Sequence, residues 1–300
     1  MKFSFPQYLL SKQSVDDRAL NRTVIEALQA SLPKTHLNIL EAGAGIGTML
    51  ARMLRWQLFP GPVDYTLVDE MPENIAFARL WLPEWAAQVG LSVDEKHPGA
   101  DLRLSAPAGP VQVHFVQADV FDFALSAPPA ADLLIAHAFL DLLPLPASLP
   151  GLFALVKPGG LAWLTINFDG LTAFEPPIDH VLDARIEQLF HRTMDERITN
   201  GVRSGDSRTG SHLFAHLEVA GASILSAGAS DWVVYPQSGG YPADEAAFLR
   251  FILHFFETSL SGLPELDPAR FSHWLAQRRA QVDEGKLIYI AHQLDFLVRV

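Results

Sequence analysis

Three glycines at alternate positions follow a carboxylate early in the chain. An apolar run beginning at Leu37 ends in Glu41, and a helix-like run begins after Gly43, Gly45 and Gly47. Glycines let the backbone approach a ligand closely, and the N-terminus of the following helix offers free N–H groups. A site for a nucleotide-like ligand and a plain strand-to-helix turn both remain open for this stretch.

The spacing of the glycines argues against a dinucleotide. The dinucleotide fingerprint G-x-G-x-x-G would place its third glycine at position 48, where the chain has Thr48. Glu41 at the mouth of the loop suits a ligand with a cationic group better than a pyrophosphate, because like charges repel.

Two further carboxylates stand where predicted strands end. Asp69, followed by Glu70, ends the second strand 22 positions after Gly47, where an acid can accept both hydroxyls of a ribose in either a dinucleotide site or an adenosine site. Asp119 ends the third strand, where it can accept the amino group of adenine while a nearby backbone N–H, that of Val120, meets a ring nitrogen. Together these acids predict a nucleoside site.

Strand and helix patterns alternate from position 37 onward. Apolar and β-branched runs predict strands over 37–40, 63–69, 111–119, 131–137 and 161–168, separated by helices over 47–56, 72–85 and 149–160. This alternation predicts an α/β fold with a doubly wound, mostly parallel sheet and helices on both faces. Ligands of such sheets bind beyond the carboxyl ends of the strands.

The second half of the chain is less regular. The region 169–210 mixes helix-like and loop patterns. The later patterns predict a helix over 211–222, a strand over 223–236 with a bulge at Gly228, helices over 243–261 and 267–284, and a last strand over 286–300.

These motifs, in this order and spacing, resemble the class I S-adenosylmethionine-dependent methyltransferase family. The resemblance rests on Glu41 to Gly47, Asp69 with Pro72 and Ala78-Arg79, Ala118-Asp119, Asp132 to Ile135, and Lys157 to Gly160. It implies S-adenosyl-L-methionine as cofactor and a Rossmann-like, seven-stranded sheet whose last strand runs antiparallel.

The resemblance also implies roles for residues. Glu41, Gly43, Ala44 and Gly45 would hold the methionine part of the cofactor, Asp69 and Glu70 the ribose, and Asp119 and Val120 the adenine. The motifs of amino-methylating DNA enzymes and of cytosine C5 enzymes are absent, which favours a small-molecule acceptor methylated at O, N or C.

We expect one methyltransferase domain over 1–300. Three segments, 1–35, 169–210 and 236–285, are expected to lie at the carboxyl-end side of the sheet as a largely helical cover for the acceptor. Transfer of a sulfonium methyl is an in-line displacement, so positioning and the exclusion of water supply much of its catalysis.

The catalytic residue is not identified, but three side chains follow predicted strands. His137 and Asp141 flank the end of the fourth strand, and Asn167 follows the fifth. His137 is a base, a wall of the cofactor pocket, or a histidine satisfied by backbone at a strand end. Asn167 contacts the acceptor or forms an Asx turn before Gly170. Whether any general base is needed depends on the acceptor.

The N-terminal stretch SVDDRALN offers Arg18 as a partner for the carboxylate of the cofactor. The same stretch also fits a capping box of Ser14 and Asp17 at a helix start. No metal site is expected, because no cysteine is present and no histidine cluster is evident.

Composition limits the partners. The 300 residues carry a formal net charge of −12 without a basic patch, which disfavours nucleic acid. No signal peptide or membrane span is evident, so a cytoplasmic protein of small-molecule metabolism is expected, with a homodimer left open. Two alternatives remain: a nicotinamide-dependent oxidoreductase, and a non-catalytic S-adenosylmethionine-binding regulatory protein.

Overall fold

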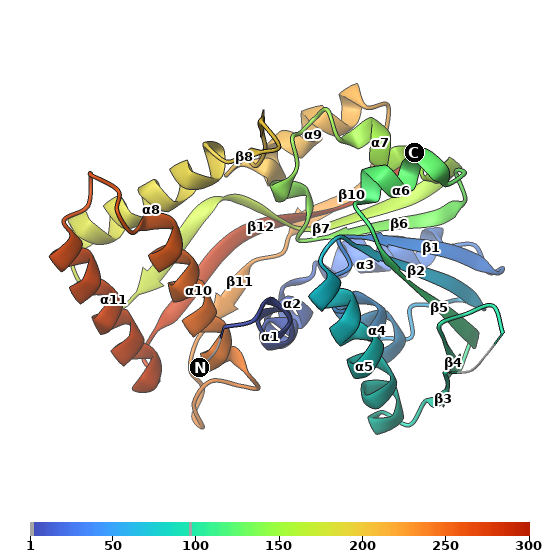
Figure 1. The fold of residues 1–300 in the computed structure, drawn as a ribbon, viewed down its shortest axis with the longest axis horizontal. Helices are drawn as coiled ribbons and strands as arrows, with labels where there is room; N and C mark the ends of the chain where they lie inside the picture. The colour runs from blue at the N-terminus through green and yellow to red at the C-terminus, as the bar shows by residue number, and fades with distance from the viewer. Residues whose placement is uncertain (1–2, 96–97) are drawn as a thin grey trace.

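A mixed ten-stranded sheet forms the centre of the molecule, whose computed structural model describes residues 3–95 and 98–300 (Figure 1). Its strands lie in the order β10 (Ser223–Ala229), β12 (Ile288–Arg299), β7 (Val156–Glu175), β6 (Ala131–His137), β1 (Leu37–Ala42), β2 (Val63–Asp69), β5 (Gly109–Gln117), β4 (Leu102–Ala106) and β3 (Ser92–Asp94), and β11 (Trp232–Val234) pairs with β12.

Strand direction confirms the predicted α/β fold with a doubly wound, mostly parallel sheet. The strands β5, β2, β1, β6 and β7 run parallel, whereas β12 is antiparallel to β7, and β10 is antiparallel to β12. The seven expected strands are all present. An antiparallel pair, β3 and β4, extends the sheet beyond β5 and was not predicted.

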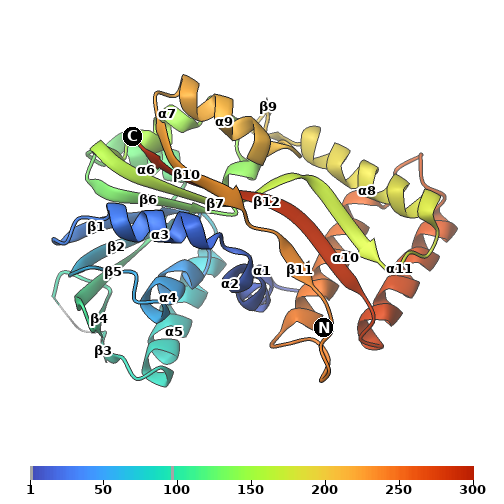
Figure 2. The same ribbon diagram turned by 180° about the vertical axis from the view of Figure 1, so that it is seen from behind.

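Helices cover both faces of the sheet. The helices α3 (Arg22–Ser31), α4 (Thr48–Arg55) and α5 (Pro72–Gln88) lie on one face, and α6 (Val120–Ser126), α7 (Leu149–Phe153) and α9 (Thr209–Val219) lie on the other (Figures 1 and 2). Strand β6 shows why its sequence is continuously apolar. Leu133 and Ile135 join the core under α4 and α5, while Leu134 and Ala136 join the core under α7 and α9.

Two long strands continue beyond the central sheet and carry a second group of helices. Strand β7 stays paired with β12 as far as the register Glu175↔Ile288. The helices α8 (His180–Asp195), α10 (Glu245–Leu260) and α11 (Pro268–Asp283) surround this extension, and a small hairpin of β8 (Ile198–Thr199) and β9 (Val202–Arg203) follows α8 (Figure 1).

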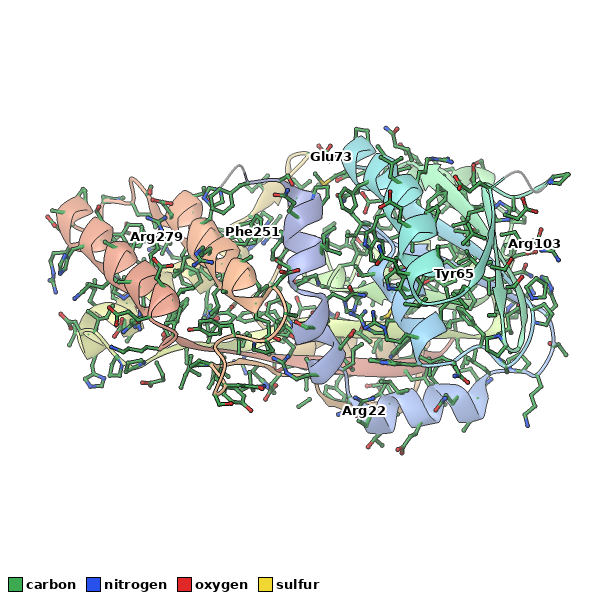
Figure 3. All side chains as sticks on the ribbon, turned by 90° about the horizontal axis from the view of Figure 1, so that it is seen from below. Arg22, Tyr65, Glu73, Arg103, Phe251 and Arg279 are labelled. Carbon is green, nitrogen blue, oxygen red and sulfur yellow. The ribbon has the colours of Figure 1, made fainter. Side chains whose placement is uncertain are left out.

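The N-terminal segment forms two short helices, α1 (Phe5–Ser11) and α2 (Gln13–Ala19). Seen from below, they lie between α10 on one side and α4 with α5 on the other (Figure 3). Tyr8 on α1 meets Phe255 of α10 edge to face, with the ring centroids 4.9 Å apart. Arg18 on α2 forms an ion pair with Glu245, which is fully buried at the start of α10.

Several predicted boundaries are wrong for identifiable reasons. The fifth strand does not end at position 168, because Gly170 adopts a φ of 73° and pairing with β12 resumes beyond it. The predicted strand 223–236 breaks between β10 and β11, and its register shifts near Ile224 rather than at Gly228. Gly228 instead makes room for Asn21, because a Cβ there would lie 2.3 Å from Asn21 Nδ2. The helix predicted over 149–160 ends at Phe153.

Among the described residues, no helix is both long and apolar enough to span a membrane.

Candidate functional site

The glycine loop joins β1 to α4 at the carboxyl end of the sheet. Gly43 and Gly45 have φ angles of 64° and 56°, in the left-handed region that favours glycine. The backbone N–H of Ala44 donates to the carbonyl of Val68 at 3.0 Å, which ties the loop to β2. A side chain on either glycine would also collide, because a Cβ on Gly43 would lie 2.3 Å from Phe139 and one on Gly45 would lie 2.7 Å from Leu9.

Glu41 is the penultimate residue of β1, two positions before Gly43 of this loop. Its side chain is 2% exposed, and the Tyr65 hydroxyl donates to its Oε2 at 2.7 Å. Burial raises the pKa of Glu41 to about 8, although the hydrogen bond from Tyr65 opposes the shift. Glu41 is therefore largely protonated at neutral pH, and a cationic ligand group beside it would favour its ionised form.

Replacing Glu41 with glutamine is expected to change how stability depends on pH. The pKa of Glu41 is higher in the folded protein than in the unfolded chain, so the wild type loses stability as pH rises from about 4.5 to about 8, at up to about 1.4 kcal/mol per pH unit. Glutamine cannot titrate. The melting temperature of Glu41→Gln should therefore rise relative to that of the wild type between pH 5 and pH 8.

The exposed Glu84→Gln is the control for this comparison, because its melting temperature should follow that of the wild type across the same range. Parallel melting curves for Glu41→Gln and the wild type over pH 5–8 would show that Glu41 is ionised throughout.

Asp69 connects the loop to the second strand. Its Oδ2 accepts the backbone N–H of Gly45 at 2.7 Å, and its Oδ1 accepts the N–H of Met71 at 2.9 Å and the amide of Asn74 at 3.0 Å. Burial raises the pKa of Asp69, while these hydrogen bonds lower it. Since a carboxylate has about four acceptor positions, Asp69 retains capacity for about one further donor, so it would not accept both ribose hydroxyls while these three bonds persist.

The third acid caps a helix. Asp119 precedes α6, and its Oδ1 accepts the backbone N–H of Phe121 at 2.7 Å and that of Asp122 at 3.3 Å. The side chain of Asp119 is exposed, as is that of Glu70 directly after β2, and Val120 is buried. The three acids thus stand at the carboxyl ends of the neighbouring strands β1, β2 and β5, as the sequence predicts.

His137 ends β6 and is bonded on both ring nitrogens. Nδ1 lies 2.8 Å from the Thr165 hydroxyl, and Nε2 lies 3.0 Å from Oδ2 of Asp16 on α2. Burial lowers the pKa of His137 to about 4, although Asp16 opposes the shift. Because an ionised Asp16 can only accept, Nε2 carries the proton and Nδ1 accepts from Thr165. The interpretation in which backbone groups satisfy His137 is therefore wrong, since both partners are side chains.

Asp16 is a buried site residue that the sequence reading did not single out. Its side chain is fully buried and lies 3.1 Å from Lys12 Nζ, 3.8 Å from Arg52 Nη2 and 2.9 Å from Trp232 Nε1. Burial alone would raise the pKa of Asp16, but Lys12, His137 and Arg52 together hold this pKa well below its usual range. Trp232 of β11, whose ring is buried, thus supplies a polar contact to Asp16.

The other predicted candidates are distributed around this centre. Asp141 lies in a short 3₁₀ turn, η1 (Leu140–Leu142), and its buried Oδ1 has no hydrogen-bond partner among the residues that the structure describes. Burial raises the pKa of Asp141. Asn167 does not form the predicted Asx turn, because it lies within β7 and donates to the carbonyls of Leu164 and Leu294.

Arg18 does not lie beside a capping box. Helix α2 begins at Gln13, its N-cap residue Lys12 makes no side-chain cap, and Ser14 donates to Glu245 instead. Arg18 donates to both carboxylate oxygens of Glu245, one of them at 2.9 Å. Arg18 therefore fastens α2 to α10, and contact with a cofactor would require it to exchange this partner.

Two strained residues border the site. Ala138 follows His137 with a φ of 50°, and Ile166 follows Thr165 with a φ of 57°. Positive φ costs a residue with a side chain on the order of 1–3 kcal/mol and is most often found at functional sites. The backbone N–H of Ile166 donates to Asp295 at 2.8 Å, which holds this conformation in place.

Several solved structures match nearly the whole chain at low sequence identity, and some of them are described as S-adenosylmethionine-dependent methyltransferases. One from Thiobacillus denitrificans, in complex with S-adenosylhomocysteine, is 14% identical, with 99% of each chain covered and a TM-score of 0.48. One from Geobacter sulfurreducens, also with S-adenosylhomocysteine, is 12% identical, with 99% of each chain covered and a TM-score of 0.45. The protein YjhP from E. coli is 15% identical, with 97% of this chain and 98% of that chain covered and a TM-score of 0.47.

No protein-family model matches the chain, and no curated protein matches it. The strand order on its own defines the class of architecture. A parallel core β5-β2-β1-β6-β7 followed by an antiparallel strand is typical of the Rossmann-like methyltransferase fold.

Proposed function

We propose that this protein transfers a methyl group from S-adenosyl-L-methionine to a small-molecule acceptor. The observation that carries the proposal is the hydrogen bond between Asp69 and the backbone N–H of Gly45, which couples the glycine loop to the acid at the end of the second strand. Glu41 and Asp119 stand on the strands to either side of it. A pyrophosphate beside these three carboxyl groups would be repelled by those that are ionised, which favours a ligand without a phosphate.

The residues of the site fit the proposed cofactor part by part. Gly43, Ala44 and Gly45 would hold its methionine part once Phe139 and Leu9 had moved off the two glycines, and Glu41 would lie beside its cationic amino group. Asp69 and Glu70 would accept ribose hydroxyls, and Asp119 with Val120 would meet adenine. When bound, the cofactor supplies a methyl group on a positively charged sulfur.

The chain would contribute to the reaction by positioning the reactants and by excluding water. His137 ends β6 and Phe139 covers Gly43 of the glycine loop, while α1 and α2 lie between α10 and the helices α4 and α5 (Figure 3). The segments 1–35, 169–210 and 236–285 of the proposed single domain would form the cover. Asp141 Oδ1, which is buried and has no hydrogen-bond partner within the described residues, would accept a proton or a hydrogen bond from an acceptor. His137 would first have to release Thr165.

Ligand-dependent melting tests the cofactor. S-adenosylhomocysteine at 100 times its dissociation constant should stabilise the folded protein by about 2.7 kcal/mol and so raise the melting temperature by several degrees. NAD should leave the melting temperature unchanged. A rise with NAD and none with S-adenosylhomocysteine would favour an oxidoreductase and reject our proposal.

Transfer is tested with methyl-labelled S-adenosylmethionine and a fractionated extract of small molecules. Label should appear in a small molecule, and Asp141→Asn should reduce the rate while leaving the affinity for S-adenosylhomocysteine within twofold. Cofactor binding without any labelled product would favour a non-catalytic regulatory protein.

A further inference from the structure

The N-terminal helices occupy the space directly above the glycine loop. The three atoms nearest to a Cβ built on Gly45 all belong to Leu9 of α1, the closest at 2.7 Å. Phe139 covers Gly43 in the same way. The two glycines that would let a ligand approach the backbone are therefore in contact with the chain's own side chains.

The same helices bring two opposite charges to this place. Lys12 and Asp16 are both buried, one helical turn apart, with Nζ and Oδ2 separated by 3.1 Å. Arg52 of α4 is buried beside them, and its Nη2 has no hydrogen-bond partner among the described residues. Lys12 also lies 5.7 Å from the ring centre of Trp232.

The surroundings of Asp16 form a site for a carboxylate. The groups that face it from other elements are the Arg52 guanidinium, the His137 imidazole N–H and the Trp232 indole N–H. Burying a carboxylate is costly unless cations and hydrogen-bond donors surround it, and this site supplies both. These three groups come from α4, β6 and β11, so they would remain if α2 moved away.

An ammonium group, a carboxylate and an apolar chain are also the parts of an amino acid. Leu9, Lys12 and Asp16 present the same three kinds of group over the loop. We propose that Asp16 is an internal stand-in for a ligand carboxylate, and that α1 and α2 hold the site shut until such a carboxylate replaces it. This inference rests on the proposed function, because the site it concerns is the proposed methyl-transfer site.

The ligand carboxylate has two possible sources, the amino-acid end of the cofactor and the acceptor. Two probes separate them. S-adenosylhomocysteine has the amino-acid end, whereas 5′-methylthioadenosine keeps the nucleoside and the thioether but lacks the carboxylate. If Asp16 competes with the cofactor, Asp16→Asn should bind S-adenosylhomocysteine at least 10-fold more tightly than the wild type does in calorimetric titration. Its affinity for 5′-methylthioadenosine should stay within twofold of the wild-type affinity.

Asp183→Asn is a matched control for this substitution. Asp183 is likewise a buried carboxylate, bonded to Arg278 at 2.7 Å and to Trp274 Nε1 at 2.6 Å, but it lies between α8 and α11. It should lower stability as Asp16→Asn does and leave both affinities unchanged. A gain in affinity in both variants would show a general loosening of the fold and overturn the inference.

A second variant keeps the test valid if Asp16→Asn folds poorly. Leu9→Ala leaves the charged groups in place and removes the side chain above Gly45, so it should also tighten the binding of S-adenosylhomocysteine by several-fold. Leu10→Ala, the neighbouring leucine of α1, is its control and should leave the affinity unchanged.

An acceptor carboxylate would give a different result. Asp16→Asn would then bind S-adenosylhomocysteine with the wild-type affinity. Acetate would raise the melting temperature of the complex between Asp16→Asn and S-adenosylhomocysteine, but not that of the wild-type complex. Weaker binding of S-adenosylhomocysteine to Asp16→Asn, or an unchanged affinity together with no effect of acetate on the melting temperature, overturns the inference while the proposed function stands. If S-adenosylhomocysteine binds to none of these proteins, the proposed function itself fails.

Discussion

Asp69→Ala is expected to weaken the binding of S-adenosylhomocysteine by about 100-fold or more. A hydrogen bond to a charged group contributes about 1.5–3 kcal/mol, and a factor of ten in affinity corresponds to about 1.4 kcal/mol. The Asp69→Ala variant would lack both the proposed hydrogen bond to ribose and the hydrogen bond that positions the N–H of Gly45. Two lost interactions of this size account for the expected factor.

Asp69→Asn separates the two contributions. The amide oxygen of asparagine can still accept the N–H of Gly45, whereas the negative charge that attracts ribose hydroxyls is lost. Its affinity for S-adenosylhomocysteine should therefore fall between those of the wild type and Asp69→Ala in calorimetric titration. The exposed Glu84→Gln, further along α5, is the control and should bind as the wild type does. Wild-type affinity in both Asp69 variants would exclude Asp69 from the nucleoside site.

The central sheet could be predicted because its signals are local. Strands β2 and β6 have the predicted bounds, since each is a short apolar run between turn residues. The glycine loop and Asp69 follow such strands directly, so their place at the carboxyl edge of the sheet follows from the strand pattern and the rule for parallel sheets. Each of these predictions needed only about ten residues of context.

The surroundings of Asp16 could not be predicted in this way. Its partners His137 and Trp232 lie 121 and 216 positions away in the chain. Nothing in the stretch around Asp16 indicates which distant donors it will meet, and an acid in a short helix is usually exposed. The burial of Arg52 could not be predicted for the same reason. A buried arginine is stable only beside carboxylates, and the fold brings these to it.

The extension of the sheet combines a local and a distant cause. Asp169 and Gly170 have the composition of a turn, so a strand ending at position 168 was the natural prediction. The pairing of β7 with β12, a strand more than 100 positions later, carries the backbone past this point, and a register shift between Ala291 and Gln293 absorbs the irregularity. The helices α8, α10 and α11 pack on this extension, so their placement depends on it.

Asp183→Ala is expected to destabilise the protein by about 3–5 kcal/mol, the cost of removing one partner of a buried ion pair. Asp183 is 7% exposed and accepts hydrogen bonds from Arg278, Trp274 and the backbone N–H of Ile178 at 2.6–2.9 Å. Without it, the fully buried Arg278 keeps its charge but loses its counter-ion. Urea unfolding at pH 7 should show the loss.

The comparison with Asp179→Ala tests the cause. Asp179 caps the same helix and pairs with Arg270, but its side chain is exposed, so its loss should cost only about 1 kcal/mol. Burial raises the pKa of Asp183, but hydrogen bonds from Trp274 and Ile178 and the charge of Arg278 lower it below its usual range. The stability that Asp183 contributes is therefore present above about pH 4 and is lost as pH falls through the pKa of the folded state. The difference in unfolding free energy between the wild type and Asp183→Ala should therefore become smaller at acidic pH. If this difference stays constant from pH 7 to pH 3, the loss of stability comes from lost packing rather than from the ion pair.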